Sequence, residues 1–374
     1  MIDSCKVCNK SSFKKVISFD KGYFSDGNKL ESLFVKEECS NCGTIRTKLE
    51  TRLDAFYKNY YNPSRSIDTF AISNDEEITR STFIYNWIID LITDSDFKQI
   101  DSIMEIGCGQ GYLLDKFKIP NKYGVEPSID ASAMAKDIAD VRNIGFENIA
   151  ESEQYDFTLS YCVIEHIENP NKFLEKNYNI LNDDGVMCIA LPIQDKFNYD
   201  LLFVDHIHHF NHKNFTNLLA NNGFEVENYE LGRGSYSNIA MYICKKGKKK
   251  KLPFEYIKNK NLENVNIVIK NINSIIEEYK DKKLYAFGYG EITKTILPYT
   301  DLDRYIENYI DDYSIEEKVI NSSNSKELFK PLDVINLILL VNPFHSEIIK
   351  NLYADVENIN FIDIFENIDK VKIL

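Results

Sequence analysis

The chain has 374 residues, of which 44% are hydrophobic and 13% aromatic, so it is long enough to bury two or three separate cores. Its formal net charge of −14 argues against a broad surface for nucleic acid or anionic lipid, because such surfaces need clustered positive charge. It has no apolar run of about 18 residues and no signal-peptide pattern at its start. These features predict a folded, cytoplasmic protein that binds neither nucleic acid nor membranes and does not require an oligomer.

Four of the eight cysteines form two pairs near the N-terminus. Two residues separate Cys5 from Cys8 and Cys39 from Cys42, and paired knuckles of this kind bring four thiolates around one zinc ion. Thiols fill all four positions and leave none for water, so the predicted zinc site is structural rather than catalytic. A redox-active CxxC pair and two chance pairs are the alternatives. The other cysteines stand singly in apolar segments, where a small buried side chain is the ordinary explanation.

The segment after the cysteines, between residues 52 and 70, is rich in aromatic residues and asparagine and includes Tyr61. It is either a packed connector or one wall of a binding site. Apolar residues at helical spacing over residues 76–94 then predict an amphipathic helix.

A glycine-rich motif at residues 104–112 is the most informative part of the chain. An apolar run that predicts a buried strand precedes it, a helix-like segment follows it, and a second short strand ends in Glu126. This order is typical of a nucleotide-type cofactor site at the carboxyl edge of a parallel sheet. Glycines let the backbone approach the ligand, and an acid after the second strand accepts hydrogen bonds from ribose hydroxyls. A dinucleotide fingerprint would need glycine where Tyr112 stands.

The motif, E-x-G-x-G-x-G, resembles motif I of the class I S-adenosylmethionine methyltransferases; a bare glycine turn is the alternative. The glycines would admit the methionine part of the cofactor, and the acid after the second strand would hold the ribose. The acid that opens the motif would support the loop or the methionine amine. The residues expected at the cofactor are Glu105, Gly107, Gly109, Gly111, Glu126 and Tyr161.

Alternating strand and helix patterns continue over residues 100–244, as an open parallel sheet requires. The third strand is poorly marked, so no adenine-contacting residue is predicted. A lysine-rich run at residues 245–251 is interpreted as a solvated linker rather than a site for an anionic partner. A second α/β unit follows, and its GYGEIT turn lacks the third glycine that a nucleotide cofactor would favour.

The predicted fold is therefore α/β, with a class I methyltransferase Rossmann-like sheet between two other units. We expect a zinc-binding module and connector at residues 1–70 and an S-adenosylmethionine-binding methyltransferase domain at residues 71–247. A C-terminal Rossmann-like, substrate-binding domain is expected at residues 252–374.

Four of the six histidines lie within residues 205–212. Methyl transfer from a sulfonium needs a nucleophile that has lost its proton and is held in line with the methyl group. Imidazole, with an ordinary pKa of about 6.5, suits the role of general base at neutral pH. The cluster is interpreted as a general base with helpers. A metal site that combines Asp205 with His208 or His209, and a purely structural role, are the alternatives.

The whole chain resembles the sugar C-methyltransferases that act on nucleotide-linked keto-deoxysugars. The shared order is a four-cysteine zinc module, a methyltransferase domain and a C-terminal Rossmann-like domain without a cofactor. Residues 124–137 (GVEPSIDASAMAKD) and 286–297 (AFGYGEITKTIL) carry the resemblance in detail. Where the family has a Glu-His pair and then a Tyr-Phe pair, this chain has Asp205-His206 and His209-Phe210.

This resemblance implies that His206 is the catalytic base and that Asp205 orients or charges its ring. The family's other active-site histidine falls on His166 and its tyrosine falls on or near Tyr61, and these residues, together with His209, would polarise an oxyanion. The nucleotide sugar would bind between the middle and C-terminal domains. The expected reaction is C-methylation through an enolate, in surface-polysaccharide or deoxysugar biosynthesis. Sugar O-methylation, a zinc-containing binding module with a degenerate methyltransferase domain, and RNA methylation are the alternatives, and the acidic charge disfavours the last.

Overall fold

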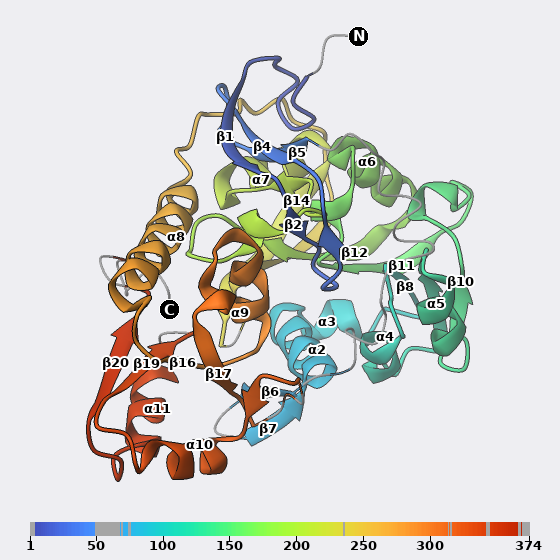
Figure 1. Ribbon diagram of the computed structural model, residues 1–374. Helices are drawn as coiled ribbons and strands as arrows, with labels where there is room; N and C mark the ends of the chain where they lie inside the picture. Colours follow the sequence, from blue (N-terminus) through green and yellow to red (C-terminus); the bar gives the residue numbers. More distant parts are fainter. Residues whose placement is uncertain are drawn as a thin grey trace.

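The computed structural model describes residues 4–48, 68, 70–73, 76–234, 236–312, 314, 316–341, 345–365 and 368 (Figure 1). Tyr61 and most of the aromatic stretch around it lie outside the described residues. Within the described part of the chain, no helix combines the length and the apolar character needed to cross a membrane.

A four-stranded antiparallel sheet in the order β1-β4-β5-β13 contains the cysteine-rich N-terminal segment. Its strands are β1 (Phe13–Phe19), β4 (Phe34–Cys39), β5 (Ile45–Lys48) and β13 (His208–His209). A hairpin of β2 (Gly22–Tyr23) and β3 (Lys29–Leu30) separates β1 from β4. Because β13 belongs to the histidine cluster, backbone hydrogen bonds join that cluster to the cysteine-rich segment, although the two are distant in sequence.

The central sheet has seven strands in the order β10-β9-β8-β11-β12-β15-β14. The strands β8 to β12 run parallel, and β15 and β14 complete the sheet antiparallel. Their bounds are β8 (Ser102–Ile106), β9 (Asn121–Val125), β10 (Asp140–Arg142), β11 (Tyr155–Tyr161), β12 (Leu181–Pro192), β14 (Phe224–Arg233) and β15 (Tyr236–Lys246). The chain order reverses between β8 and β11, so their carboxyl ends form the edge where α/β sheets bind ligands.

The parallel α/β sheet confirms the predicted fold class, and it explains why the third strand was poorly marked, because β10 has only three residues. Helices pack on both sides of this sheet (Figure 1). They are α2 (Arg80–Leu91), α3 (Asp94–Phe97), α4 (Tyr112–Lys116), α5 (Ile129–Ala135), α6 (Pro170–Ile180) and α7 (His212–Asn221). Three-residue helical turns follow several strands, among them η2 (Phe146–Asn148), η3 (Ile164–His166) and η4 (Asp200–Leu202).

The helix predicted over residues 76–94 begins later than expected. Its first four residues form β7 (Glu76–Thr79), which pairs with β6 (Phe70–Ser73). The hydroxyl of Thr79 accepts a hydrogen bond from the Thr82 backbone N–H, and this N-cap starts α2.

A second parallel sheet forms the C-terminal part of the chain, in the order β18-β17-β16-β19-β20. Its strands are β16 (Leu284–Phe287), β17 (Ile306–Ile310), β18 (Val319–Ile320), β19 (Ile335–Leu339) and β20 (Ile359–Asp363). The helical elements are α8 (Lys260–Tyr279), α9 (Glu291–Ile296), α10 (Ser322–Phe329), α11 (Ser346–Leu352), η5 (Leu297–Tyr299) and η6 (Leu302–Arg304). Figure 1 shows this unit, in orange and red, beside the central sheet.

The chain between β12 and α7, which contains three of the six histidines, is held from two sides. A single apolar cluster unites Phe34 of the N-terminal sheet, Leu202 of this segment and Tyr299 of the C-terminal unit. The Tyr299 hydroxyl also donates a hydrogen bond to the Leu202 carbonyl. On the same side, the Asn261 side chain donates to the Gln194 side-chain oxygen at 2.9 Å. These contacts fix the histidine segment against both neighbouring units.

Candidate active site

Three glycines shape the loop that follows β8. Gly107, Gly109 and Gly111 have φ values of +71°, +53° and +83°, a region that residues with a side chain rarely adopt. A Cβ on Gly107 would lie 2.6 Å from the Val163 side chain, so that position also lacks room. A Cβ on Gly109 would meet no described atom within 4 Å. The loop therefore leaves open space above Gly109 that a ligand can occupy.

Glu126, at the end of β9, lies against this loop. One carboxylate oxygen accepts from the Gly109 backbone N–H at 3.0 Å, and the other accepts from the Ser128 N–H at 2.8 Å. Burial raises the pKa of Glu126 above its ordinary value. Each carboxylate oxygen has further acceptor capacity, so Glu126 can hold the loop and still accept from ribose hydroxyls. The structure places Glu126 where the predicted ribose contact requires it, and the contact itself stays a prediction.

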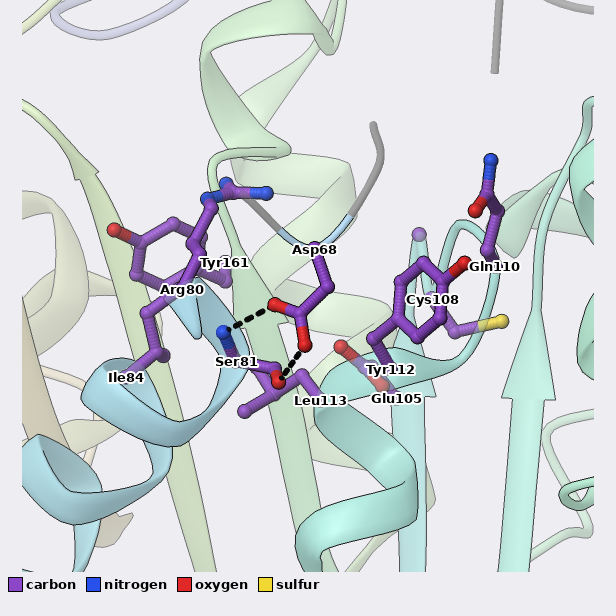
Figure 2. Close-up of a pocket in the computed structure, with 11 residues that line it drawn as sticks. Asp68, Arg80, Ser81, Ile84, Glu105, Cys108, Gln110, Tyr112, Leu113 and Tyr161 are labelled. Carbon is purple, nitrogen blue, oxygen red and sulfur yellow. Dashed lines mark hydrogen bonds between the residues drawn. The ribbon is translucent and has the colours of Figure 1, made fainter. Parts of the chain in front are cut away.

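A pocket beside the loop gathers side chains from α2, β8, α4 and β11 (Figure 2). Among the residues that line it are Arg80, Glu105, Gly107, Gln110, Tyr112 and Tyr161. On the α2 side, the Asp68 carboxylate accepts from the Ser81 N–H at 2.7 Å and the Ser81 hydroxyl at 2.6 Å. The pocket thus lies between α2 and the glycine loop.

Unpartnered polar atoms are buried in this pocket. One carboxylate oxygen of Glu105 and the hydroxyl of Tyr161 have no hydrogen-bond partner among the described residues. Burial raises the pKa of Glu105 to about 8. Buried polar groups are costly unless they are hydrogen-bonded, so a ligand with a cationic donor fits here. The ammonium group of S-adenosylmethionine is such a donor, and the residues present therefore fit the predicted cofactor.

His166 and His206 meet at the same edge of the sheet, after β11. Their ring centroids lie 4.6 Å apart with the planes nearly perpendicular. Between β11 and His166, Cys162 has a φ of +56°, an uncommon value for a residue with a side chain. This sharp turn redirects the chain from the strand into η3, which carries His166.

The carboxylate that contacts His206 is Asp200, not the predicted Asp205. Asp200 lies in η4, and its two oxygens bind Nδ1 of His206 and Nδ1 of His209. The Gln194 side-chain amide also donates to Asp200, at 2.8 Å. Although burial opposes it, the two imidazoles hold the pKa of Asp200 well below its ordinary range. Burial by itself would lower the pKa of His206, but the charge of Asp200 outweighs the effect of burial and raises that pKa to about 9.

Asp205 has a different set of partners. Its carboxylate accepts from the Ser25 backbone N–H at 2.8 Å and from the Ser25 hydroxyl at 2.6 Å. One oxygen lies 3.6 Å from Nδ1 of His166, and its backbone carbonyl lies 3.0 Å from the same nitrogen. The prediction was that Asp205 orients or charges the His206 ring. Its first part is corrected, because the turn of η4 brings Asp200 to Nδ1 of His206, whereas the charge of Asp205 still helps to raise the pKa of His206.

His209 does not lie at the open side of the site, where a polariser is expected. It is 1% exposed, with Nδ1 on Asp200 and Nε2 2.7 Å from the Lys36 ammonium. Lys36 comes from β4 and also donates to the Thr47 hydroxyl and the Phe203 carbonyl, each at 2.7 Å. Burial lowers the pKa of Lys36 to about 7. His209 therefore supports Asp200 from behind, and the polarising role predicted for it does not match its position.

Sequence reasoning missed Asp200, Lys36 and Glu165. Glu165 is 1% exposed, and neither of its carboxylate oxygens has a hydrogen-bond partner among the described residues. Burial raises its pKa to about 8. The only local signal was the position of Glu165 next to His166; nothing in the spacing pointed to Asp200 or Lys36.

The four N-terminal cysteines converge as the CxxC pairs predict. The Cys5 and Cys42 sulfurs are 3.8 Å apart, the Cys8 and Cys39 sulfurs are 3.6 Å apart, and all four lie within 4.8 Å of one another. Zinc–sulfur bonds of about 2.3 Å place the sulfurs of a tetrahedron about 3.8 Å apart. The geometry therefore fits a structural zinc ion, which would have no position left for water.

Comparison with known proteins supports the assignment of the central sheet to a methyltransferase domain. Residues 67–229 match the family model of a methyltransferase domain. A ubiquinone biosynthesis O-methyltransferase of Rhodopseudomonas palustris (strain TIE-1) is 32% identical over 97 residues, which cover 24% of this chain and 38% of that protein. An uncharacterized protein of Methanocaldococcus jannaschii is 35% identical over 100 residues, 25% of this chain and 46% of that one. The matches thus span less than half the length of these relatives.

Among solved structures, one that resembles this chain is a putative S-adenosylmethionine-dependent methyltransferase from Listeria monocytogenes. It has a TM-score of 0.39 and 14% identity, and the match covers 45% of this chain and all of that one. The family match and the strand order of the central sheet together show that the middle of the chain is a class I methyltransferase domain.

Proposed function

The middle of this chain is an S-adenosylmethionine-dependent methyltransferase domain, and we propose that its methyl acceptor is a nucleotide-linked keto-deoxysugar. The observation that carries this proposal is the His206–Asp200 pair, which lies at the same edge of the sheet as the glycine loop. When bound, S-adenosylmethionine supplies a methyl group activated by a positively charged sulfur. The protein's task is then to produce the nucleophile and hold it in line.

His206 is the proposed general base. A carboxylate only accepts, so Nδ1 of His206 donates to Asp200 and, in the neutral ring, the lone pair is on Nε2. Nε2 takes a proton from the carbon beside the keto group, and that carbon gains the electron pair with which it attacks the methyl group. The fraction of neutral His206 grows as the pH rises toward about 9, so turnover is expected to increase over that range.

The polarising groups proposed for the enolate oxygen are His166 and Tyr61. Nδ1 of His166 faces the Asp205 carbonyl, which only accepts, so this nitrogen carries the ring proton. Polarisation by its other nitrogen would therefore require a second proton on the ring. Tyr61 lies outside the described residues, and its role stays a prediction. The nucleotide is proposed to bind between the central and C-terminal sheets, which both pack against the histidine segment.

Methylation of a sugar hydroxyl is the second candidate. The observation in its favour is that curated relatives of the central domain are O-methyltransferases of ubiquinone biosynthesis. The same His206 would then remove a proton from oxygen instead of carbon.

The test is turnover with methyl-labelled S-adenosylmethionine on two panels, nucleotide-linked keto-deoxysugars and nucleotide sugars without a keto group. NMR of a carbon-bound methyl from the first panel would support the proposal, and a methoxy product would support the second candidate. No product from either panel would reject both.

The base is tested with His206→Ala, which should lower kcat by about 10²–10⁴-fold while leaving cofactor affinity unchanged. His212→Ala is the matched control, because His212 belongs to the same cluster but its Nδ1 lies 2.9 Å from the Tyr242 hydroxyl. Normal turnover by His206→Ala would refute the assignment.

A further inference from the structure

Glu165, His166 and His206 form a compact group of possible metal ligands outside the four-cysteine cluster. One carboxylate oxygen and one nitrogen from each ring lie within 4.8 Å of one another. Glu165 and His166 come from η3, and His206 comes from the segment before β13. The fold, not local spacing, brings them together.

Both imidazoles are oriented as metal-binding histidines are. Nδ1 of His206 faces the Asp200 carboxylate, and Nδ1 of His166 faces the Asp205 carbonyl. Each of these partners only accepts, so each neutral ring carries its proton on Nδ1 and its lone pair on Nε2. A carboxylate or carbonyl behind the ring is the usual outer partner of a histidine that binds a cation.

Glu165 supplies the independent observation. Its side chain is 1% exposed, and both carboxylate oxygens lack a hydrogen-bond partner among the described residues. Asp200 and Asp205 are buried nearby, whereas the buried cation Lys36 is directed to His209 and to backbone carbonyls. A buried carboxylate without a hydrogen-bond donor is costly. A cation bound beside Glu165 would supply the partner that its two oxygens lack.

We propose that Glu165, His166 and His206 bind a divalent transition-metal cation. One carboxylate and two imidazoles suit Mn²⁺, Fe²⁺ and Zn²⁺, and three protein ligands leave further positions for water or an acceptor oxygen. The His166 side chain is 16% exposed, which gives the group an opening to solvent. Only the identity of that acceptor rests on the proposed function; cation binding itself does not.

The proposal also bears on the two candidate reactions. The lone pair of His206 can bind a cation or accept a proton, but not both. The cation-bound protein therefore loses His206 as a base, which C-methylation needs, while a sugar hydroxyl bound to the cation would lose its proton to water more readily.

The experiment is a titration of the full-length, zinc-replete protein with Mn²⁺, in which the EPR signal of free Mn²⁺ reports binding. Mn²⁺ prefers oxygen and nitrogen to thiolates, so it should leave the four-cysteine site undisturbed. We expect one saturable site per chain. Glu165→Gln keeps the shape of the side chain but removes its charge, and it should weaken Mn²⁺ affinity by more than about tenfold.

The matched control is Glu168→Gln, which makes the same charge change at an exposed residue of the same loop and should keep wild-type affinity. His166→Gln is a second ligand variant, and S-adenosylmethionine affinity checks that each variant is folded. Absence of a saturable site, or equal affinity in Glu165→Gln and Glu168→Gln, would overturn the proposal. No sugar is present in the titration, so its outcome is independent of the turnover panels.

Discussion

In both parallel sheets of this protein, an acid after one strand accepts a hydrogen bond from the loop after the neighbouring strand, but the two loops differ in their surroundings. In the central sheet, Glu126 after β9 accepts from the Gly109 N–H of the loop after β8. In the C-terminal sheet, Asp311 after β17 accepts from the Tyr289 N–H of the loop after β16, at 2.9 Å. Strand, turn, helix and acid therefore occur in both, and they do not by themselves make a cofactor site.

The difference lies in what occupies the space at the end of the first strand. When the two motifs are aligned, Ala286 stands where the central sheet has Glu105, and Ile292 stands where it has Gly111. The C-terminal loop thus lacks the unpartnered carboxylate and the last glycine of the central loop.

The C-terminal turn is also closely packed against β17 and the end of β19. A Cβ on Gly288 would lie 2.8 Å from the Leu340 carbonyl, and the Tyr289 ring lies 4.7 Å from Tyr309. The Thr293 hydroxyl donates to the Gly288 carbonyl at 2.7 Å. A glycine turn can therefore be a packing feature. Because the Cβ positions of Gly109 and Gly290 are both open, the distinguishing mark of the ligand site is the unsatisfied polar atoms beside the central loop.

The largest effect is expected from the zinc ion predicted at the four cysteines of a third region, the N-terminal sheet. Three of these cysteines, Cys5, Cys39 and Cys42, share an apolar cluster with Met104 and Ile189 of the central sheet. Removal of zinc should lower the free energy of unfolding by several kcal/mol and up to about 10 kcal/mol, because zinc affinity contributes directly to folding. Thermal unfolding before and after chelation, with zinc quantified, measures this. Added zinc should restore the transition; an unchanged transition after proven zinc loss would contradict the prediction.

The second-largest effect is expected on cofactor affinity, where the comparison of the two sheets predicts different outcomes for two glycines at equivalent positions. Gly109→Ala should lower S-adenosylmethionine affinity by roughly 100-fold, or about 2.7 kcal/mol, because the new methyl group enters the space left for the ligand. Gly290→Ala should change neither affinity nor folding, since its φ of −83° suits alanine and no described atom lies within 4 Å of the Cβ. Calorimetric titration measures both. Equal affinities in the two variants would break the comparison.

Glu105→Gln should weaken cofactor binding by about tenfold, since it removes the charge opposite the ammonium group. The wild-type pKa of about 8 adds a pH dependence. Below pH 8 the free protein holds Glu105 protonated, and binding a cation must release that proton, so affinity should rise as the pH increases toward 8 and then level off. Titrations at several pH values test this. A wild-type affinity that is flat with pH would argue against a contact between Glu105 and the ammonium group.

The smallest effect is expected at the second acid. Asp311→Asn replaces the charged acceptor of the Tyr289 N–H with a neutral one and should cost about 1 kcal/mol of stability, with no change in cofactor affinity. Chemical denaturation combined with a binding titration measures both quantities. A loss of cofactor affinity would mean that the C-terminal loop takes part in binding after all.

By itself, the sequence determined the features that depend on local spacing. Two CxxC pairs, three glycines after an apolar strand and Glu126 at the end of the next strand all have a regular distance along the chain. Short-range geometry then dictates where their backbone and side chains lie. The alternation of strands and helices fixed the α/β class for the same reason.

Only the tertiary structure decided the partners at the acceptor side. Lys36 meets His209 from another strand of the same sheet, although the two are 173 residues apart along the chain. Asp200 rather than Asp205 holds His206, and Glu165 lies beside a ring 41 residues away along the chain. These contacts follow from the three-residue turn η4 and from packing between distant segments, which no periodicity in the sequence records. The cofactor side of the site could be predicted because it is built from one continuous motif. The acceptor side could not, because it is assembled from three separate segments of the chain.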